Sequence, residues 1–249
     1  MKKSVIALAV GAAAAMWARA DYRAWTALGK GGLPHTLRGW ARMSRLRLQK
    51  GETIGTTTLD SEVGTAGDRA YLGALIHRCG PRPKVAPHPI PHRQLNQFTS
   101  TAIRQRLDAV FDEAVRARPQ LLCFETSFFE KHGPAVTLCS PERGHRWAAA
   151  THGEIGHIHQ GDGSMHLILS ASDAKAAIEA GWGERHPLAG SLGLPITYLY
   201  VYPPRDEVEL DTVRLLLSAA IDHMSGSSLP AVKPDSAAGF PVPISHFPA

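Results

Sequence analysis

Short strand-like segments separated by turn residues follow one another between residues 121 and 169, and they constrain the fold more than any other feature. Four segments are predicted to be strands: 121–129, 135–139, 147–159 and 165–169. The last two are separated by Gln160 to Ser164, where Asp162-Gly163 is a strong hairpin signal. Connections this short join antiparallel strands, because parallel neighbours need a crossover of about a dozen residues or more.

Helical patterns flank these strands. Residues 99–117 repeat apolar side chains at helical spacing. Ser170 and Asp206 are placed to cap two later helices, and residues 196–202 form one more strand between them. The order predicts an α+β fold, a two-layer sandwich whose mainly antiparallel sheet carries helices on one face. A hydrophobic helix is expected to precede it.

The positive charge of the chain is confined to its N-terminal fifth. Residues 1–50 hold ten Lys or Arg and one acid, whereas the remainder holds 17 basic and 21 acidic residues, giving the overall charge of +5. A nucleic-acid-binding domain should carry its basic patch on the folded part, so this distribution argues against that class. It favours a basic segment beside a membrane surface.

The N-terminus reads as a targeting segment. Lys2-Lys3 precede an apolar run over residues 5–17, and Ala18-Arg19-Ala20 has the form of a signal-peptidase site. One interpretation is a single-pass anchor through residues 4–20. The alternative is a signal that is cleaved near Ala20, which would make the protein secreted.

Composition divides the chain into five parts. Residues 36–48 have arginines on one helical face, which fits either a helix in the lipid interface or one packed on the domain. Five prolines make residues 78–93 extended, and we expect them to lie along the surface. The predicted parts are a hydrophobic anchor (1–20), a basic amphipathic segment (21–50), a Gly/Pro-rich extended segment (51–93), the α+β domain (94–226) and a disordered tail (227–249).

Histidines gather on the predicted hairpin. His157 and His159 point to the same face of their strand because side chains alternate. If Asp162-Gly163 is a two-residue turn, His159 lies opposite His166, and the three imidazoles share one face.

Three interpretations of these histidines stay open. They could bind Zn²⁺ or Fe²⁺, although the carboxylate expected a few residues after an H-x-H pair is missing, and Gln160 and Asp162 fit poorly. They could perform acid–base chemistry near neutral pH, which we favour over a metal. They could be hydrogen-bonded structural side chains. A thiolate zinc site is not expected, because the three cysteines form no C-x-x-C pair.

The run from Gly181 to Gly190 is rich in side chains that can hold a ligand. Trp182 offers a flat apolar face, Arg185 can bind an oxyanion or enolate, and His186 precedes a proline that keeps it extended. A rigid loop with Arg185 paired to Glu184 explains the same residues without a function. Tyr200, with its neighbours two residues away on either side, lines one face of the following strand.

Four stretches of the chain resemble the fungal luciferase family. They are Glu154-Ile155-Gly156-His157-Ile158-His159, Met165-His166-Leu167, the run from Gly181 to Gly190, and Tyr202-Pro203-Pro204-Arg205-Asp206-Glu207. The resemblance is strongest over residues 154–224. It implies a membrane-spanning N-terminus and an oxygenase that needs no added cofactor and uses O₂ as co-substrate. Its substrate would be a small enolisable compound such as 3-hydroxyhispidin.

The resemblance also suggests how the residues are used. A histidine among His157, His159, His166 and His186 would deprotonate the hydroxypyrone, and Arg185 would stabilise the enolate. Substrate binding would involve Glu154, Trp182, Glu184, Arg185 and Tyr200. The enzyme could emit light. The alternatives are a metal-dependent enzyme using His157, His159 and His166, and a non-catalytic small-molecule-binding protein.

Overall fold

The structure, a computed structural model, describes residues 2–65 and 67–226. Its centre is a six-stranded antiparallel sheet with strand order β1-β2-β3-β4-β6-β5. The strands are β1 Leu122–Thr126, β2 Pro134–Leu138, β3 Glu154–Ile158, β4 Met165–Ile168, β5 Gly183–Arg185 and β6 Tyr198–Val201. The sheet is open at both edges, and every strand pairs in the antiparallel sense that the short connections predicted.

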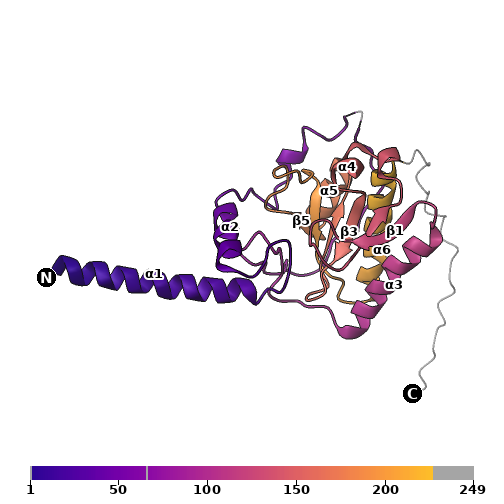
Figure 1. The fold of residues 1–249 in the computed structure, drawn as a ribbon. Helices are drawn as coiled ribbons and strands as arrows, with labels where there is room; N and C mark the ends of the chain where they lie inside the picture. Colours follow the sequence, from indigo (N-terminus) through magenta and orange to yellow (C-terminus); the bar gives the residue numbers. More distant parts are fainter. Residues whose placement is uncertain (1, 66, 227–249) are drawn as a thin grey trace, which may run out of the picture.

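Two long helices cover one face of the sheet (Figure 1). They are α3 Thr101–Ala117, capped by Ser100, and α6 Glu207–Ser225, capped by Asp206. Apolar side chains such as Ile155 and Leu167 point at these helices and form the main core. The prediction of an α+β sandwich with helices on one face is therefore confirmed.

Shorter helices complete the fold. They are α2 Leu37–Arg47, η1 Thr57–Leu59, η2 Pro141–Arg143, α4 Arg146–Ala150 and α5 Ala171–Glu179. Ser170 accepts a hydrogen bond from the amide of Asp173, so it caps α5 as expected. The prediction of one strand over residues 147–159 is wrong in its first half, because α4 and a tight turn at Gly153 precede β3. Strand β5 was not predicted.

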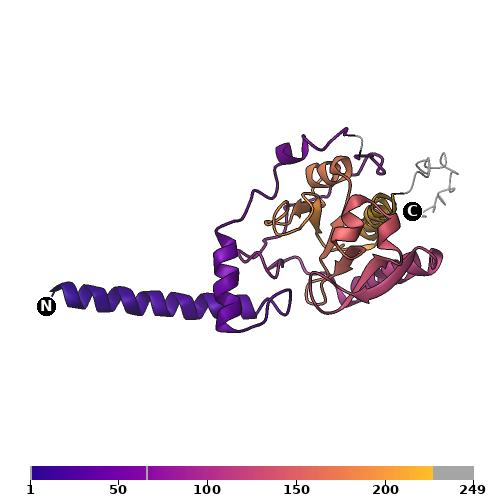
Figure 2. The ribbon, with the colours of Figure 1, turned by 45° about the horizontal axis from the view of Figure 1, so that its top comes forward.

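The N-terminal helix α1 Lys2–Thr26 projects away from the domain (Figures 1 and 2). Its segment Val5–Thr26 is long and apolar enough to cross a membrane, and the same properties are found in signal sequences. Helix α2 crosses the inner end of α1 and packs with Gly39, Met43 and Leu46 inward. Arg38, Arg42 and Arg45 of α2 remain exposed.

The face of the sheet opposite α3 and α6 is covered by irregular chain, and α2 lies beside this chain. The prediction that residues 78–93 lie along the surface is wrong for several of them, because His88, His92 and Arg93 are buried. Trp25 at the end of α1 is fully buried and donates a hydrogen bond to the carbonyl of Ile90. We call residues 86–94 the covering segment. The predicted tail, residues 227–249, lies outside the described residues.

Candidate active site

The hairpin β3–β4 brings three histidines together on the face turned away from the helices. His157 lies directly opposite His166, and the amide of His159 donates to the carbonyl of Ser164. The predicted register, with His159 opposite His166, is therefore wrong by two residues. The turn is longer than two residues, and an even shift keeps every side chain on its face. The ring centroids of His157, His159 and His166 lie 4.9–5.4 Å apart.

Each of these three rings is oriented through its Nδ1 atom. His157 Nδ1 lies 2.5 Å from Glu154 Oε1. His159 Nδ1 lies 2.8 Å from Ser164 Oγ, and that hydroxyl donates to Asp162 Oδ1 at 2.6 Å. His166 Nδ1 lies 3.2 Å from the backbone carbonyl of Leu199. Since all three partners accept, each ring carries a proton on Nδ1, so in its neutral form the lone pair lies on Nε2.

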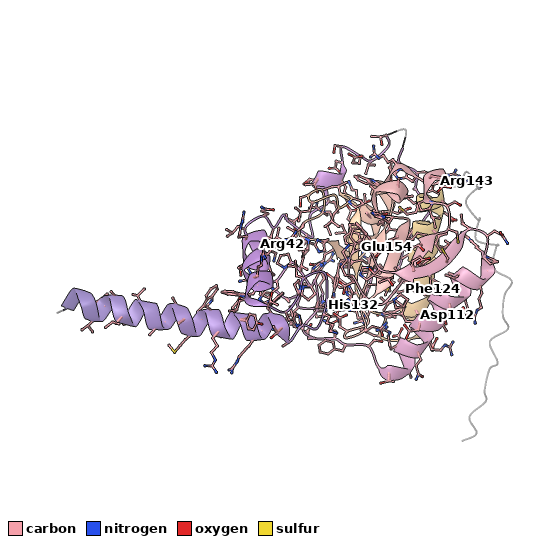
Figure 3. The ribbon with its side chains drawn as sticks, in the orientation of Figure 1. Arg42, Asp112, Phe124, His132, Arg143 and Glu154 are labelled. Atoms are coloured by element: carbon pink, nitrogen blue, oxygen red, sulfur yellow. The ribbon has the colours of Figure 1, made fainter. Side chains whose placement is uncertain are left out.

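Glu154 is the best-held carboxylate of the site. Its side chain accepts from Ser127 Oγ and from the amides of Phe128 and Phe129, in addition to His157. It is 1% exposed and lies inside the domain, whereas the labelled Arg42 is an exposed residue of α2 (Figure 3). Glu154 was predicted to bind substrate, but these contacts show a residue that orients His157.

A second histidine–carboxylate pair joins the covering segment to β5. His92 Nε2 lies 3.4 Å from Glu184 Oε1, and Glu184 also accepts from the hydroxyl of Tyr202 at 2.9 Å. His92 Nδ1 is buried and makes no hydrogen bond to a described residue. The ring of His92 lies 5.6 Å from that of His166 and 5.1 Å from that of His186. Glu184 and His186 thus lie beside the other histidines of the site.

Arg93 and Glu130 close the cluster from the same side. Arg93 Nη2 donates to Glu130 Oε2 at 2.5 Å and to the carbonyl of Lys30 at 3.0 Å. The other oxygen, Glu130 Oε1, lies 3.9 Å from His157 Nε2 and 3.8 Å from His159 Nε2. A carboxylate therefore faces the lone pairs of two histidines, beyond hydrogen-bond distance.

Burial lowers the pKa of four of the histidines of the site. Loss of hydration lowers the pKa of His159, His166 and His186 well below 6.5, and it also lowers the pKa of His92. The charge of Arg93 acts in the same direction on the pKa values of His92, His159 and His166.

The tyrosines of the site stay protonated. Burial raises the pKa of Tyr198 and of Tyr200 well above 10. The Tyr198 ring stacks on His166 with a centroid distance of 4.5 Å, whereas the Tyr200 hydroxyl donates to Asp162 Oδ2 at 3.2 Å. Tyr200 was predicted to bind substrate, and the structure places it in the cluster.

A cavity of about 270 Å³ leads to the cluster between α2 and the covering segment. Its walls include Leu46 of α2, Phe129 and Lys131, and His92, His166, His186 and Tyr198 line it as well. This volume is close to the lower end, ~300 Å³, of the range that holds small ligands. A groove along α2 shares Leu33, Arg42, Leu46 and Leu192 with the cavity, so the opening runs beside α2.

Two predicted residues are not brought to the cluster. Trp182 packs in the main core, and its indole N–H donates to the carbonyl of Ile76. Arg185 is opposite Leu199, a core residue, and its guanidinium donates to the carbonyl of Glu52. Trp182 and Arg185 therefore lie away from the histidine cluster, and their roles in contacting the ligand and in stabilising an enolate stay predictions.

Sequence reasoning missed three residues of the site. His92 and Arg93 belong to the proline-rich covering segment, and Glu130 follows β1 in a loop. None shows a periodic pattern. The one available signal was the density of histidine and arginine among the prolines of residues 87–93.

Comparison with known proteins agrees with the resemblance of the sequence motifs. The model of the Luciferase domain family matches residues 152–220, which contain β3, β4, β5 and β6. A luciferase of Armillaria gallica is 34% identical over 88% of this chain and 86% of its own length. A luciferase of Neonothopanus nambi is 31% identical over 83% of this chain and 81% of its own.

These similarities extend over most of both chains, including the covering segment. The chain therefore belongs to the fungal luciferase family. No solved structure gives a significant match.

Proposed function

We propose that this protein is an oxygenase that takes a small enolisable aromatic compound of the hydroxypyrone class and oxidises it with O₂. The observation that carries the proposal is the buried cavity whose walls combine neutral histidines with tyrosine. A neutral imidazole can accept an enolic proton, and an apolar, water-poor cavity protects a reactive oxygenated product. Membership of the luciferase family supports O₂ chemistry. It also supports light emission, which the measurement of photon output below tests.

The base in this scheme is His92. Its side chain lines the cavity, its Nε2 faces Glu184, and its Nδ1 has no hydrogen-bond partner among the described residues, so Nδ1 is the nitrogen left to accept a proton. His186 is less suited, because its Nδ1 already accepts from the amide of Leu188. His157 and His159 are not among the residues that line the cavity.

The reaction would proceed in three steps. His92 takes the enolic proton, and the electron pair of the enolate carbon forms a bond to O₂. The terminal peroxide oxygen then adds to the lactone carbonyl, and the lactone C–O bond breaks, so that the ring oxygen leaves as an enolate and takes back the proton held by His92. Cleavage of the O–O and C–C bonds of the resulting four-membered cyclic peroxide then releases CO₂. Arg93 is the buried cation beside the cluster, so it takes the role of stabilising negative charge that was predicted for Arg185. O₂ is the co-substrate, and the scheme requires no organic cofactor.

Substrate recognition would come from the cavity walls. The Tyr198 hydroxyl is buried and has no hydrogen-bond partner among the described residues, so it is available to a carbonyl or hydroxyl of the ligand. Phe129 and Leu46 supply apolar surface for an aromatic ring.

We place the protein in a membrane as a single-pass anchor through residues 4–20. Helix α1 continues without a break past Ala20 to Thr26, and the domain binds its last turns. Asp21 accepts from Trp40 Nε1 at 2.8 Å and from Arg47 Nη2 at 3.0 Å. Intact-mass analysis of the membrane fraction tests this, and a chain that begins at Asp21 would contradict it.

The function is tested with 3-hydroxyhispidin as the probe. The full chain in mild detergent is supplied with the compound in air, and oxygen uptake, CO₂ release and photon output are recorded. The His92→Gln variant should lower kcat by about 10²–10⁴-fold, the usual contribution of a general base, with a smaller change in KM. His77→Gln, at an exposed position, is the matched control. Absence of oxygen uptake by the wild type, or full activity of His92→Gln, would contradict the proposal.

A further inference from the structure

Three imidazoles and one carboxylate lie close together on the face of the sheet that is turned away from α3 and α6. The ligand atoms of His157, His159 and His166 all lie within 4.8 Å of one another, and all three residues are buried. Glu130 Oε1 lies 3.8–3.9 Å from the Nε2 atoms of His157 and His159. His157 lies in β3, His159 directly follows that strand, His166 lies in β4 and Glu130 lies in the loop after β1, so the hairpin and its neighbour hold these groups in place.

The hydrogen bonds at Nδ1 prepare these rings to bind a cation. A carboxylate, a hydroxyl bonded to a carboxylate, and a backbone carbonyl each accept an Nδ1–H. Outer partners of this kind fix the tautomer and orientation of metal-binding histidines and make Nε2 more basic. They leave three Nε2 lone pairs directed inward.

Two of these lone pairs have no partner in the protein. His157 Nε2 and His159 Nε2 are buried, and no described residue forms a hydrogen bond with them. Buried acceptors that face one another and a carboxylate oxygen repel, and a buried polar atom without a partner destabilises the folded protein. A cation bound between these atoms would remove the repulsion and give both nitrogen atoms a partner.

Distance and charge fit a small divalent ion. Ligand atoms around a tetrahedral ion with bonds of ~2.1 Å are ~3.4 Å apart. The observed separations are at most 4.8 Å, so the side chains would close in by up to about 1.4 Å on binding. Glu130, Glu154 and Asp162 carry three formal negative charges, and Arg93 offsets one of them. A divalent ion would balance the remaining two.

A second histidine group is less suitable. His92, His166 and His186 also have ligand atoms within 4.8 Å of one another. However, His186 Nδ1 accepts from the amide of Leu188, and His92 Nε2 points at Glu184. A metal there would have to displace bonds that the first group leaves free.

We propose that His157, His159 and His166, together with Glu130, form a binding site for a divalent first-row transition-metal ion. Sequence reasoning found the three histidines but no carboxylate, because β2, η2 and α4 separate Glu130 from β3 in the chain. The proposal that the ion binds here rests on the geometry alone. Its use in oxygenation rests on the function proposed above, where it would place positive charge behind His166 and close to the enolate.

The test measures metal binding directly. The full chain in mild detergent is stripped with a chelator, dialysed, and titrated with Zn²⁺ by calorimetry and with Co²⁺ by visible absorption. We expect one ion per chain and cobalt absorption bands typical of mixed imidazole and carboxylate coordination. His77→Gln and His223→Phe are controls at histidines outside the group, and both should bind as the wild type does.

Three variants separate a metal site from a structural cluster. His159→Gln removes a ligand and should abolish binding, and Glu130→Gln should weaken it. In Glu154→Gln the amide oxygen must face the Phe128 amide, so the NH₂ group faces His157 Nδ1 and forces the proton onto Nε2. That variant keeps every ligand, yet its affinity should fall by about 10–100-fold.

The outcomes are distinct. Absence of binding by the wild type, or unchanged affinity in His159→Gln and Glu154→Gln, would overturn the site. If His159→Gln does not fold, Glu130→Gln and Glu154→Gln decide the question, with circular dichroism of the metal-free proteins confirming their fold. Metal binding without oxygen uptake would overturn the proposed function and leave the site standing. Oxygen uptake by a chain that binds no metal would overturn the site alone.

Discussion

Acidification should destabilise this domain through His223, a histidine of α6 outside the candidate site. The side chain is 5% exposed, and its ring lies 4.3 Å from the ring of His145 and 6.4 Å from that of Tyr71. Burial, assisted by His145, lowers the pKa of His223 from 6.5 to about 3. The folded protein therefore keeps this ring neutral at a pH where the unfolded chain protonates it.

The sign and size follow from proton linkage. Because the folded pKa lies below the unfolded value, the stability contribution is complete above pH 6.5 and is lost as the pH falls from 6.5 toward 3. At pH 5.0, about 1.5 pH units below the unfolded pKa of 6.5, this histidine is protonated in the unfolded chain but stays neutral in the folded chain. At about 1.4 kcal/mol per unit, His223 alone should lower the free energy of unfolding by about 2 kcal/mol between pH 7.5 and pH 5.0.

Urea unfolding of the full chain in mild detergent, followed by tryptophan fluorescence at the two pH values, measures this loss. His223→Phe keeps an aromatic ring and removes the titrating group, so its pH-dependent loss should be about 2 kcal/mol smaller than that of the wild type. Other titrating groups are common to both proteins and cancel in the difference. His77→Gln, at an exposed position, should behave as the wild type. Equal losses in His223→Phe and wild type would refute the reasoning.

Two further substitutions test how the site is held. In Gly156→Ala, a Cβ would lie 2.4 Å from the carbonyl oxygen of His166, so β3 and β4 must move apart. We expect a loss of about 1–3 kcal/mol in thermal unfolding and weaker Zn²⁺ binding; an unchanged melting temperature would contradict this. Trp25→Phe removes the donor to Ile90, which should cost about 1 kcal/mol and speed limited proteolysis within the covering segment. Unchanged cleavage rates there would speak against the proposed contact.

The sheet and its histidine face were predictable because they follow from alternation. His157, His159 and His166 lie on one face in the predicted register and in the observed one, since the two differ by an even number of residues. A shift of one residue would have sent His166 into the core. The helices were equally accessible, because Ser100, Asp206 and their apolar repeats are local signals.

The remainder of the site depends on contacts between distant parts of the chain. Arg185 looked like an anion-binding residue, but pairing of the three-residue strand β5 with β6 turns it toward the opposite face and brings Glu184 to the site. His92, Arg93 and Glu130 lie in irregular chain, where no period reveals which side is buried. Their positions follow from tertiary hydrogen bonds, such as that of Arg93 with Lys30.

The N-terminal helix is structurally coupled to the site. Asp21 near the end of α1 binds Arg47 of α2 and contacts His88 of the covering segment, and Trp25 holds the carbonyl of Ile90 two residues before His92. The cavity opens between these same elements, along the groove of α2. Any displacement of α1 relative to the sheet would move the peptide that positions His92 and Arg93. The helix that is apolar enough to cross a membrane therefore also helps to shape the entrance through which an apolar substrate would reach the histidines.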